Sequence, residues 1–487
     1  MRQVISSADQ PTLDPNRWRA LAVCITALAM TLLDVSTVNV ALPSIGRSIG
    51  AGVAQLQWIV SGYVLAFGMV PIIAGRLGDD RGRRTVLLIG IAGFVISSAV
   101  VGFAPNPAVL VGARLAQGLS GGLINPQVSG LIQQLFPARE RGVAFGMLGS
   151  AVGISTATGP VLGGLIIGLG GDDWGWRLTF LINVPVGLTA FLLCRRWLPA
   201  TEHVRRHRPL DLPGVALLTS GLFCILFPVV QYDSHHDPQL AFGLIPAAGL
   251  LSAFVAWERG PARRRGYPLI DISLFRIRSY ADGLTLAIFY FCAYSGLPLV
   301  LSLFLQDGLG FSAERSGLTA GAYALGATVS APFAGRLVGR LGRRLLIGSL
   351  LLFTAGILAI AVTLHLAGRG DPGGWLALAL IGPLVLAGIG GGSVITPNQA
   401  LSLAEIDVRG GSTAGGMLQT SQRIGSALGT ALTSAVFYAA ARGGPATGVG
   451  HARHYTNAFA TALLVCLTFS LAALAVALRE IRRRKAL

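Results

Sequence analysis

Residues 75–84 read GRLGDDRGRR, and residues 335–344 read GRLVGRLGRR. Each string lies between two apolar stretches, and a second echo pairs RERGVAFGM (139–147) with RGGSTAGGM (409–417). Two such echoes at similar offsets indicate that the chain contains two copies of one unit. The aspartates of the first string are missing from the second, a difference that needs a physical reason.

The composition is that of a polytopic helical membrane protein. Of the 487 residues, 53% are hydrophobic and only 12% are charged, whereas soluble proteins carry about 25% charged residues. Apolar stretches of about 20 residues, the length that a helix needs to cross a bilayer, recur along the whole chain. Fourteen spans are predicted, at 20–43, 56–76, 85–104, 108–131, 143–169, 178–198, 211–231, 239–257, 280–304, 314–335, 345–366, 374–401, 412–440 and 457–478.

The net charge of +17 is explained by topology. Most Lys and Arg residues fall in loops on the side of both termini, which the positive-inside rule assigns to the cytoplasm. We therefore expect a protein of the cell membrane with both termini cytoplasmic and membrane lipids around it. No segment is long enough for a basic soluble domain, so nucleic acid is not an expected partner.

Several other classes of site are not expected. The sequence has no GxxxxGK[ST] loop, so ATP is not the expected energy source. The five cysteines fall within spans without paired spacing, which favours packing roles. His451 and His454 have metal-like spacing but no acidic or cysteine companion nearby, so neither a metal nor a cofactor is expected.

The duplication predicts the organisation of the chain. Spans one to six and nine to fourteen form two six-helix halves, and spans seven and eight are an insert flanked by basic linkers. The expected segments are a cytoplasmic 1–17, an N-terminal half 18–200, an insert 201–270, a C-terminal half 271–478 and a basic tail 479–487. Repeated halves of this kind are one plan of secondary transporters, with the substrate between them.

Three ionisable residues lie in the middle of spans: Asp34, Arg114 and Arg423. Each costs at least ~2.5–3.5 kcal/mol in the bilayer, so each is a functional candidate. A carboxylate whose pKa rises on desolvation and falls when an arginine approaches can carry a proton across the membrane. The alternatives are a structural ion pair or a snorkelling arginine for Asp34 and Arg114, and contact with a backbone carbonyl or a lipid-exposed water defect for Arg423.

The first basic string is predicted to form a cytoplasmic gate. Its glycines, Gly75, Gly78 and Gly82, permit a tight turn and close helix approach. Asp79 can pair with a basic group and with the positive N-terminus of a neighbouring helix, a contact that forms only when the cytoplasmic side is closed. In the second copy of the string Gly339 stands at the position of Asp79. The neighbouring arginines are Arg76, Arg81, Arg83 and Arg84.

Two further sets of residues are candidates. The segment GSAVGISTATGPVLGGL (149–165) gathers Gly159, Gly163 and Gly164 around Pro160, which favours a bend and close helix contact. Generic tight packing is the alternative. Aromatic residues of spans two and nine could line an apolar substrate cavity, although packing or lipid contact is the more common role of any one of them. The candidate cavity residues are Asn39, Trp58, Ser61, Gln117, Tyr290, Tyr294 and Arg423.

Together these motifs resemble the major facilitator superfamily, and within it the fourteen-helix drug:proton antiporter branch (EmrB/QacA type). The resemblance implies an all-α fold of two six-helix bundles plus two inserted helices. It also implies that Asp34 is the protonation site, that Arg114 is its coupling partner and that Pro160 belongs to an antiporter seal. The motifs are LDVSTVNVALP (33–43), GRLGDDRGRR (75–84), RLAQG (114–118), GPVLGG (159–164) and WRLTFLINVPVG (176–187).

The sequence therefore predicts a transporter, not an enzyme, that exchanges protons for an amphipathic drug or antibiotic. Members that expel multivalent cations carry an acid at the position of Ser61, and here no acid other than Asp34 lies at mid-depth. A neutral, monocationic or anionic substrate is expected. The alternatives are export of an endogenous lipid or metabolite, a non-transporting membrane sensor and a membrane-embedded enzyme.

Overall fold

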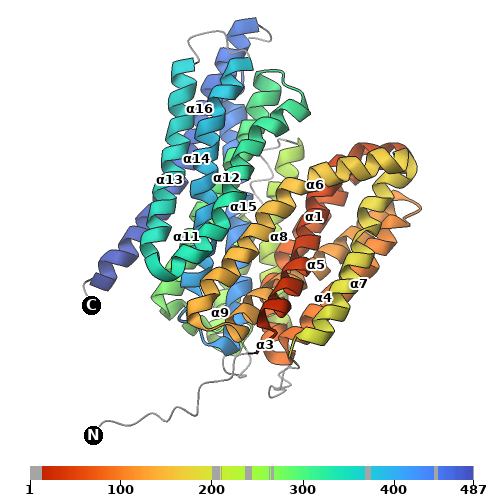
Figure 1. The fold of residues 1–487 in the computed structure, drawn as a ribbon, viewed down its shortest axis with the longest axis vertical. Helices are drawn as coiled ribbons and strands as arrows, with labels where there is room; N and C mark the ends of the chain where they lie inside the picture. Colours follow the sequence, from red (N-terminus) through yellow and green to blue (C-terminus); the bar gives the residue numbers. More distant parts are fainter. Residues whose placement is uncertain are drawn as a thin grey trace.

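In a computed structural model, the described residues fold into a bundle of long helices (Figure 1). They comprise 14–199, 209, 211–235, 244–262, 264, 268–367, 374–443 and 448–485. Long apolar segments form helices because a helix satisfies all backbone hydrogen bonds within one segment. Both ends of the helical part, where α1 starts and α16 finishes, lie at one end of the molecule, called here the termini end.

The first group of helices covers the first part of the chain. It comprises α1 (Arg17–Ile49), α2 (Val53–Met69), α3 (Pro71–Arg81), α4 (Arg83–Gly102), α5 (Pro107–Leu135), α6 (Ala138–Leu181) and α7 (Asn183–Trp197). The inserted pair is α8 (Leu212–His235) and α9 (Leu244–Trp257), followed by the short η2 (Glu258–Ala262).

The second group comprises α11 (Arg278–Leu303), α12 (Ala313–Leu341), α13 (Arg343–Ala367), α14 (Gly374–Ser402), α15 (Gly411–Ala441) and α16 (Gly448–Lys485). Three short turns connect helices on this side: η3 (Ile272–Arg276), η4 (Phe304–Gly308) and η5 (Val408–Gly410).

Eight helices among the described residues are long and apolar enough to cross a membrane, or up to ten if each of two bent pairs is one span. The predicted count of fourteen spans is not confirmed by this measure. α5 and α12 have 29 residues each and are long enough to span, but they carry glycine and polar residues that lower their hydropathy. A helix surrounded by other helices tolerates such residues because its polar groups find partners in protein.

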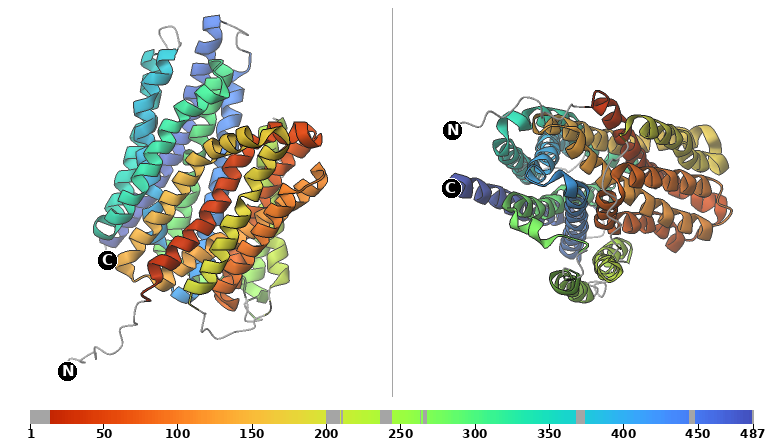
Figure 2. Two further views of the ribbon diagram at one scale, coloured as in Figure 1. Left: turned by 45° about the vertical axis from the view of Figure 1, so that its right-hand side comes forward. Right: turned by 90° about the horizontal axis from the view of Figure 1, so that it is seen from below.

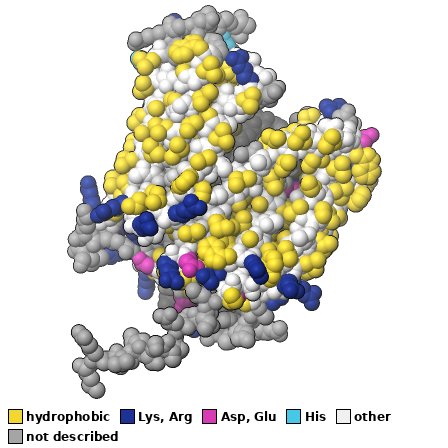
Figure 3. Space-filling model, in the orientation of Figure 1, with side chains coloured by type: hydrophobic (Ala, Val, Ile, Leu, Met, Phe, Trp, Pro, Cys, Tyr) yellow, Lys and Arg dark blue, Asp and Glu magenta, His cyan; other side chains and the backbone are white. Residues whose placement is uncertain are grey.

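The two groups meet at the termini end and separate toward the far end (Figures 1 and 2). The space-filling view shows the surface hollowed between the two helix groups at the end opposite the termini end, called here the far end (Figure 3). One apolar core lies within α11–α16, and another joins α1–α7 to residues of α8, α9, α11 and α15. Seen from below, α8 and α9 lie together at one edge, outside both groups (Figure 2).

Candidate functional site

Asp34 lies at the centre of a buried polar cluster in the first helix group. Its side chain on α1 is fully buried, and that of Arg114 on α5 is 1% exposed. The Arg114 guanidinium donates from Nη1 to Asp34 Oδ2. Because the pair is removed from water, the two charges interact strongly, and loss of either partner would leave the other charge buried without compensation.

Two amides complete the coordination of the carboxylate. Gln117 Nε2 and Asn183 Nδ2 donate to Asp34 Oδ1 at 3.0 and 2.9 Å. Gln117 also contacts Ser98 Oγ at 2.8 Å, so α1, α4, α5 and α7 all contribute to the cluster. Asn183 and Ser98 were not among the predicted residues. Asn183 had a visible signal, since it is an amide within an apolar predicted span.

Aromatic rings cover the arginine of this cluster. The Arg114 guanidinium lies 4.2 Å from the ring centroid of Tyr63 and 5.5 Å from that of Phe180. Its Nε donates to the Ile59 carbonyl at 3.0 Å. A cation over an aromatic face is stabilised where water is excluded. The rings therefore hold Arg114 in place independently of its ion pair.

A second cluster joins the two helix groups at the termini end. Asp79 at the end of α3 accepts hydrogen bonds from Ser412 N (3.1 Å), Thr413 N (2.8 Å) and Thr413 Oγ1 (2.7 Å) at the start of α15. The first backbone N–H groups of a helix have no partner within it and carry partial positive charge. A carboxylate there is doubly favoured, as a hydrogen-bond acceptor and as a charge.

Arg83 links this contact to further backbone. Its Nη2 donates to Asp79 Oδ1 at 2.9 Å, its Nη1 donates to the Gly130 carbonyl at 2.7 Å, and Nη2 also donates to the Val408 carbonyl. Gly75 lies directly against α15, where an added Cβ would be 2.3 Å from the Ser412 carbonyl oxygen. Asp79, Arg83 and Gly75 thus make the contact between the groups.

The other predicted gate residues lie outside that contact. Arg81 is exposed, and Arg76 pairs with Asp80 at 2.9 Å within α3. Arg84 donates to the Arg195 carbonyl at the end of α7. Gly82 has a φ of 100° and forms the turn between α3 and α4, a conformation that favours glycine.

The second copy of the string makes a different contact between the groups. Gly335 on α12 packs against α6, where its added Cβ would be 2.5 Å from Gly146 Cα. Arg343, the counterpart of Arg83, pairs with Glu480 of α16 within its own group. The close glycine approach therefore occurs in both copies, whereas the carboxylate between the groups occurs only in the first.

The glycines of the antiporter motif lie against α1. An added Cβ on Gly159 would be 2.2 Å from Ser36 Cβ, and one on Gly163 would be 3.3 Å from Thr37 Cα. Pro160 and Gly164 are exposed and face away from α1. The part of α6 before this motif packs on α12 through Gly142 and Gly146, and the two parts of α6 are bent by 41°.

The predicted cavity residues do not form one surface. Gln117 and Tyr290 are buried, at 0% and 1% exposure, so they do not line an open cavity here. Gln117 belongs to the Asp34 cluster, and Tyr290 donates to the Gly391 carbonyl in the core of the second group. Periodicity did not distinguish an aromatic core position from a cavity position.

The remaining cavity candidates are partly or fully accessible. Asn39 on α1 is exposed, and Ser61 and Tyr294 are half-buried. The Trp58 ring lies 6.0 Å from that of Phe227 on the inserted α8. Arg423 on α15 lies over Phe67 of α2, with 4.8 Å between the guanidinium carbon and the ring centroid.

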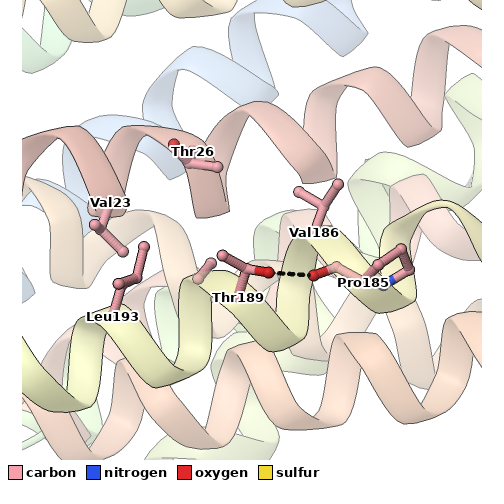
Figure 4. A pocket seen from close by; sticks show the side chains of 7 residues that line it. Val23, Thr26, Pro185, Val186, Thr189 and Leu193 are labelled. Carbon is pink, nitrogen blue, oxygen red and sulfur yellow. Dashed lines mark hydrogen bonds between the residues drawn. The ribbon is translucent and has the colours of Figure 1, made fainter.

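An apolar groove of about 330 Å³ lies between α1 and α7 (Figure 4). Its lining comprises Val23, Thr26, Pro185, Val186, Thr189, Ala190 and Leu193. Both threonine hydroxyls donate to carbonyls of their own helices, that of Thr189 to Pro185 at 2.8 Å. The groove offers little polar chemistry and is separate from the two clusters.

A buried carboxyl group lies at the base of the inserted pair. Burial raises the pKa of Glu258 to about 7. The hydrogen bond that its carboxyl group accepts from the Leu269 N–H, at 3.0 Å, opposes this shift. The nearby Asp211 carboxylate raises this pKa further, and Arg76 of α3 lowers it. Asp211 in turn accepts from the Trp257 ring N–H at 2.9 Å. The described residues contain no group of three metal-binding side chains.

Known proteins resemble this chain over most of its length. The model of the Major Facilitator Superfamily matches residues 24–430 and 283–486. A "Probable actinorhodin transporter" of Streptomyces coelicolor is 37% identical over 87% of this chain and 72% of its own. A "Tetracenomycin C resistance and export protein" of Streptomyces glaucescens is 32% identical over 85% of this chain and 75% of its own.

The fold comparison agrees with the sequence comparison. The crystal structure of the human organic anion transporter MFSD10 superimposes with a TM-score of 0.64 at 20% identity, covering 95% of this chain and all of the other. With the family model matching most of the chain, the protein is a transporter and not an enzyme. The chain therefore belongs to the major facilitator superfamily, as a membrane protein with multiple transmembrane helices.

Proposed function

We propose that the protein is a proton-coupled exporter of antibiotic-like amphipathic molecules, of the fourteen-helix drug:proton antiporter branch. In this proposal the termini end faces the cytoplasm, and the two helix groups, 18–200 and 271–478, rock about a substrate site between them. Relatives named for the export of antibiotics support the substrate class. The inserted helices α8 and α9 lie beside the two groups.

The observation that carries the proposal is the Asp34 cluster. Its carboxylate is fully buried, and the Arg114 guanidinium and two amides stabilise its charged form. Protonation of Asp34 would remove the charge that holds these groups and would leave Arg114 with an uncompensated charge. The cluster would then rearrange, which couples proton binding to helix position.

The contact between Asp79 and α15 supports the cycle. It closes the termini end while the far end is hollowed between the lobes, which corresponds to a conformation open to the outside. In this conformation a proton from outside would reach Asp34 and the exported molecule would leave. Opening of the termini end then requires that the bonds to Asp79 break.

Proteoliposomes containing the full-length protein and a pH-sensitive dye in the lumen test this proposal. Actinorhodin or tetracenomycin C is added under an imposed pH gradient, and compound-dependent proton movement is recorded. We expect proton movement with the wild type and none with Asp34→Asn, because an amide cannot take up the proton.

Asp173→Asn is the matched control. This exposed carboxylate accepts one hydrogen bond from Ser48 at 2.9 Å outside the Asp34 cluster, so its loss should leave proton movement unchanged. Proton movement that survives in Asp34→Asn would overturn the coupling role. Transport of neither compound by the wild type, with lipid or metabolite flux in its place, would overturn the drug substrate.

A further inference from the structure

Arg423 differs from the buried Arg114 and Arg83 in having no anionic partner among the described residues. It lies in the middle of α15, between the two helix groups, and its side chain is half-buried. Its guanidinium rests on the Phe67 ring at 4.8 Å, and no hydrogen bond or ion pair joins it to any residue that the structure describes. An arginine at mid-depth in a membrane protein is costly, so one that lacks a protein partner points to a ligand.

The neighbouring charges leave Arg423 uncompensated. Asp34 and Arg114 neutralise one another, and α15 itself contributes no acid along its length. Four helices that pack against α15 contribute no compensating acid at this level. α2 has no charged residue, α11 has them only near its start, α3 only in its second half, and α16 only near its two ends. In the sequence of α8 the acid Asp233 stands two residues from the helix end. The described side chains therefore leave the charge of Arg423 without a compensating acid.

Three polar residues of the same helix just before Arg423 each have one side-chain atom without a partner, although the Gln419 amide nitrogen donates to Asn125 Oδ1 and Ser129 Oγ. Gln422 Nε2, Gln419 Oε1 and Thr420 Oγ1 are buried without a hydrogen-bond partner among the described residues. Gln419 and Thr420 are each only 4% exposed. Buried polar atoms without partners are uncommon in folded proteins, and a cluster of them requires an explanation. Gln422 Nε2 is a donor, as is the Arg423 guanidinium beside it in the sequence.

A row of rings connects this position to the Asp34 cluster. The Phe67 ring, over which the Arg423 guanidinium lies, stacks on the Tyr63 ring with 5.9 Å between the ring centroids. The opposite end of the row is Arg114, which lies 4.2 Å from the Tyr63 ring. Two arginines thus cover one stacked pair of rings, and a movement of Arg114 on protonation of Asp34 can be transmitted through the pair to Arg423.

We infer that Arg423 binds the anionic group, a carboxylate or phenolate, of the exported molecule, with the Gln422 amide as a second donor. This assigns an amphipathic organic anion as the substrate class, and it rests on the proposed export function. Exchange of one proton for a monoanion moves two positive charges inward per cycle. An inside-negative membrane potential therefore drives the exchange in addition to the pH gradient.

Binding of a matched set of dansyl probes to the full-length protein in phosphatidylcholine nanodiscs tests the inference. The set is dansylglycine (anion), its methyl ester (neutral) and dansylcadaverine (cation), which share one aromatic body. We expect dansylglycine to bind best. Loss of a hydrogen bond to a charged group corresponds to roughly a ten- to hundredfold loss of affinity, which is expected for dansylglycine in Arg423→Gln. The ester should bind both proteins equally, and Arg423→Lys should recover part of the anion preference.

Arg315→Gln is the matched control. This arginine also lies over an aromatic ring, 3.9 Å from the centroid of Phe311, but it is exposed and at the start of α12. The ratio of dansylglycine to ester affinity should be unchanged in this variant. The same ratio in Arg423→Gln as in the wild type would overturn the inference, as would preferred binding of dansylcadaverine.

Two further arms separate the possible sources of the anion. Displacement of dansylglycine by chloride or phosphate at lower concentration than by organic carboxylates would assign the site to an inorganic ion. Displacement by phosphatidylglycerol in the nanodisc would assign it to a lipid headgroup; either result overturns the substrate claim. Proton movement driven only by the ester or the cation would keep the exporter and refute the anion site. Anion binding without coupled proton movement would support the anion site and refute the proton-coupled exporter.

Discussion

Neutralising Asp79 should open the termini end. The Asp79→Asn amide keeps one acceptor oxygen but loses the charge that three donors of Ser412 and Thr413 share. A hydrogen bond to a charged group contributes about 1 kcal/mol more than a neutral one, so three bonds lose about 3 kcal/mol. This loss of about 3 kcal/mol already includes the interaction of the Asp79 charge with the positive N-terminus of α15. Because Asp79 is 5% exposed, solvent screening does not reduce it.

A shift of this size changes the ratio of open to closed molecules by roughly a hundredfold, since 1.4 kcal/mol corresponds to a factor of ten. Ser129 provides the reporter: it is 2% exposed on α5 and packs against α15 at Gly415. In a background without the five native cysteines, Ser129→Cys should react with an impermeant maleimide only when the termini end opens. Its labelling rate should rise by about the same factor in Asp79→Asn.

The control is the adjacent carboxylate. Asp80 pairs with Arg76 on its own helix at 2.9 Å, so Asp80→Asn should leave the labelling rate close to that of the wild type. Thr413→Val removes only the hydroxyl donor and should give an intermediate rate. Labelling of Asp79→Asn at the wild-type rate would refute the idea that this carboxylate holds the two helix groups together.

Three further changes probe other contacts. Gly335→Ala should separate α12 from α6, because its Cβ would be 2.5 Å from backbone; cross-linking between the two helices at the termini end should fall. Gly159→Ala should lower the midpoint of thermal unfolding in detergent, since overpacking against α1 costs about 1–3 kcal/mol. Thermal stability should fall from pH 5 to pH 8, because the folded state holds a proton on Glu258 up to a pKa of about 7, above its usual 4.5. Glu258→Gln should abolish that part of the pH dependence, and an unchanged profile would contradict it.

The sequence predicted charged positions better than their partners. Asp34 and Arg114 were recognisable because ionisable residues are rare in apolar spans, and the structure brings them into contact. Asn183 and Ser98 join them only because α4 and α7 pack beside α1 and α5. That packing depends on many side chains at once, and no local pattern encodes it.

Other residues show the same limit. A helix N-terminus was predicted as a partner of Asp79, but nothing near residue 79 identifies the start of α15, more than 300 residues later in the chain. Tyr290 and Tyr294 lie one helical turn apart, yet Tyr290 is in the core whereas Tyr294 is half-buried. Aromatic residues suit a packed core and a ligand cavity equally well, so their spacing alone does not separate the two.

The two strings differ in the chemistry that each brings to the start of a helix in the other group. In the first copy α3 ends at the start of α15, so a carboxylate at residue 79 meets unpaired N–H groups. In the second copy the end of α12 meets the first turns of α6: an added Cβ on Gly339 would be 4.0 Å from the Arg139 carbonyl oxygen, and Gly142 and Gly146 pack against Gly335. Gly339 brings no carboxylate to this helix start, and the contact is made by the close packing of Gly335 against Gly146. One side of the closed end is thus held by charge and the other by close packing. Because the bonds to Asp79 depend on charge and the Gly335–Gly146 contact does not, removal of the Asp79 charge loosens the first side while the second remains a pivot.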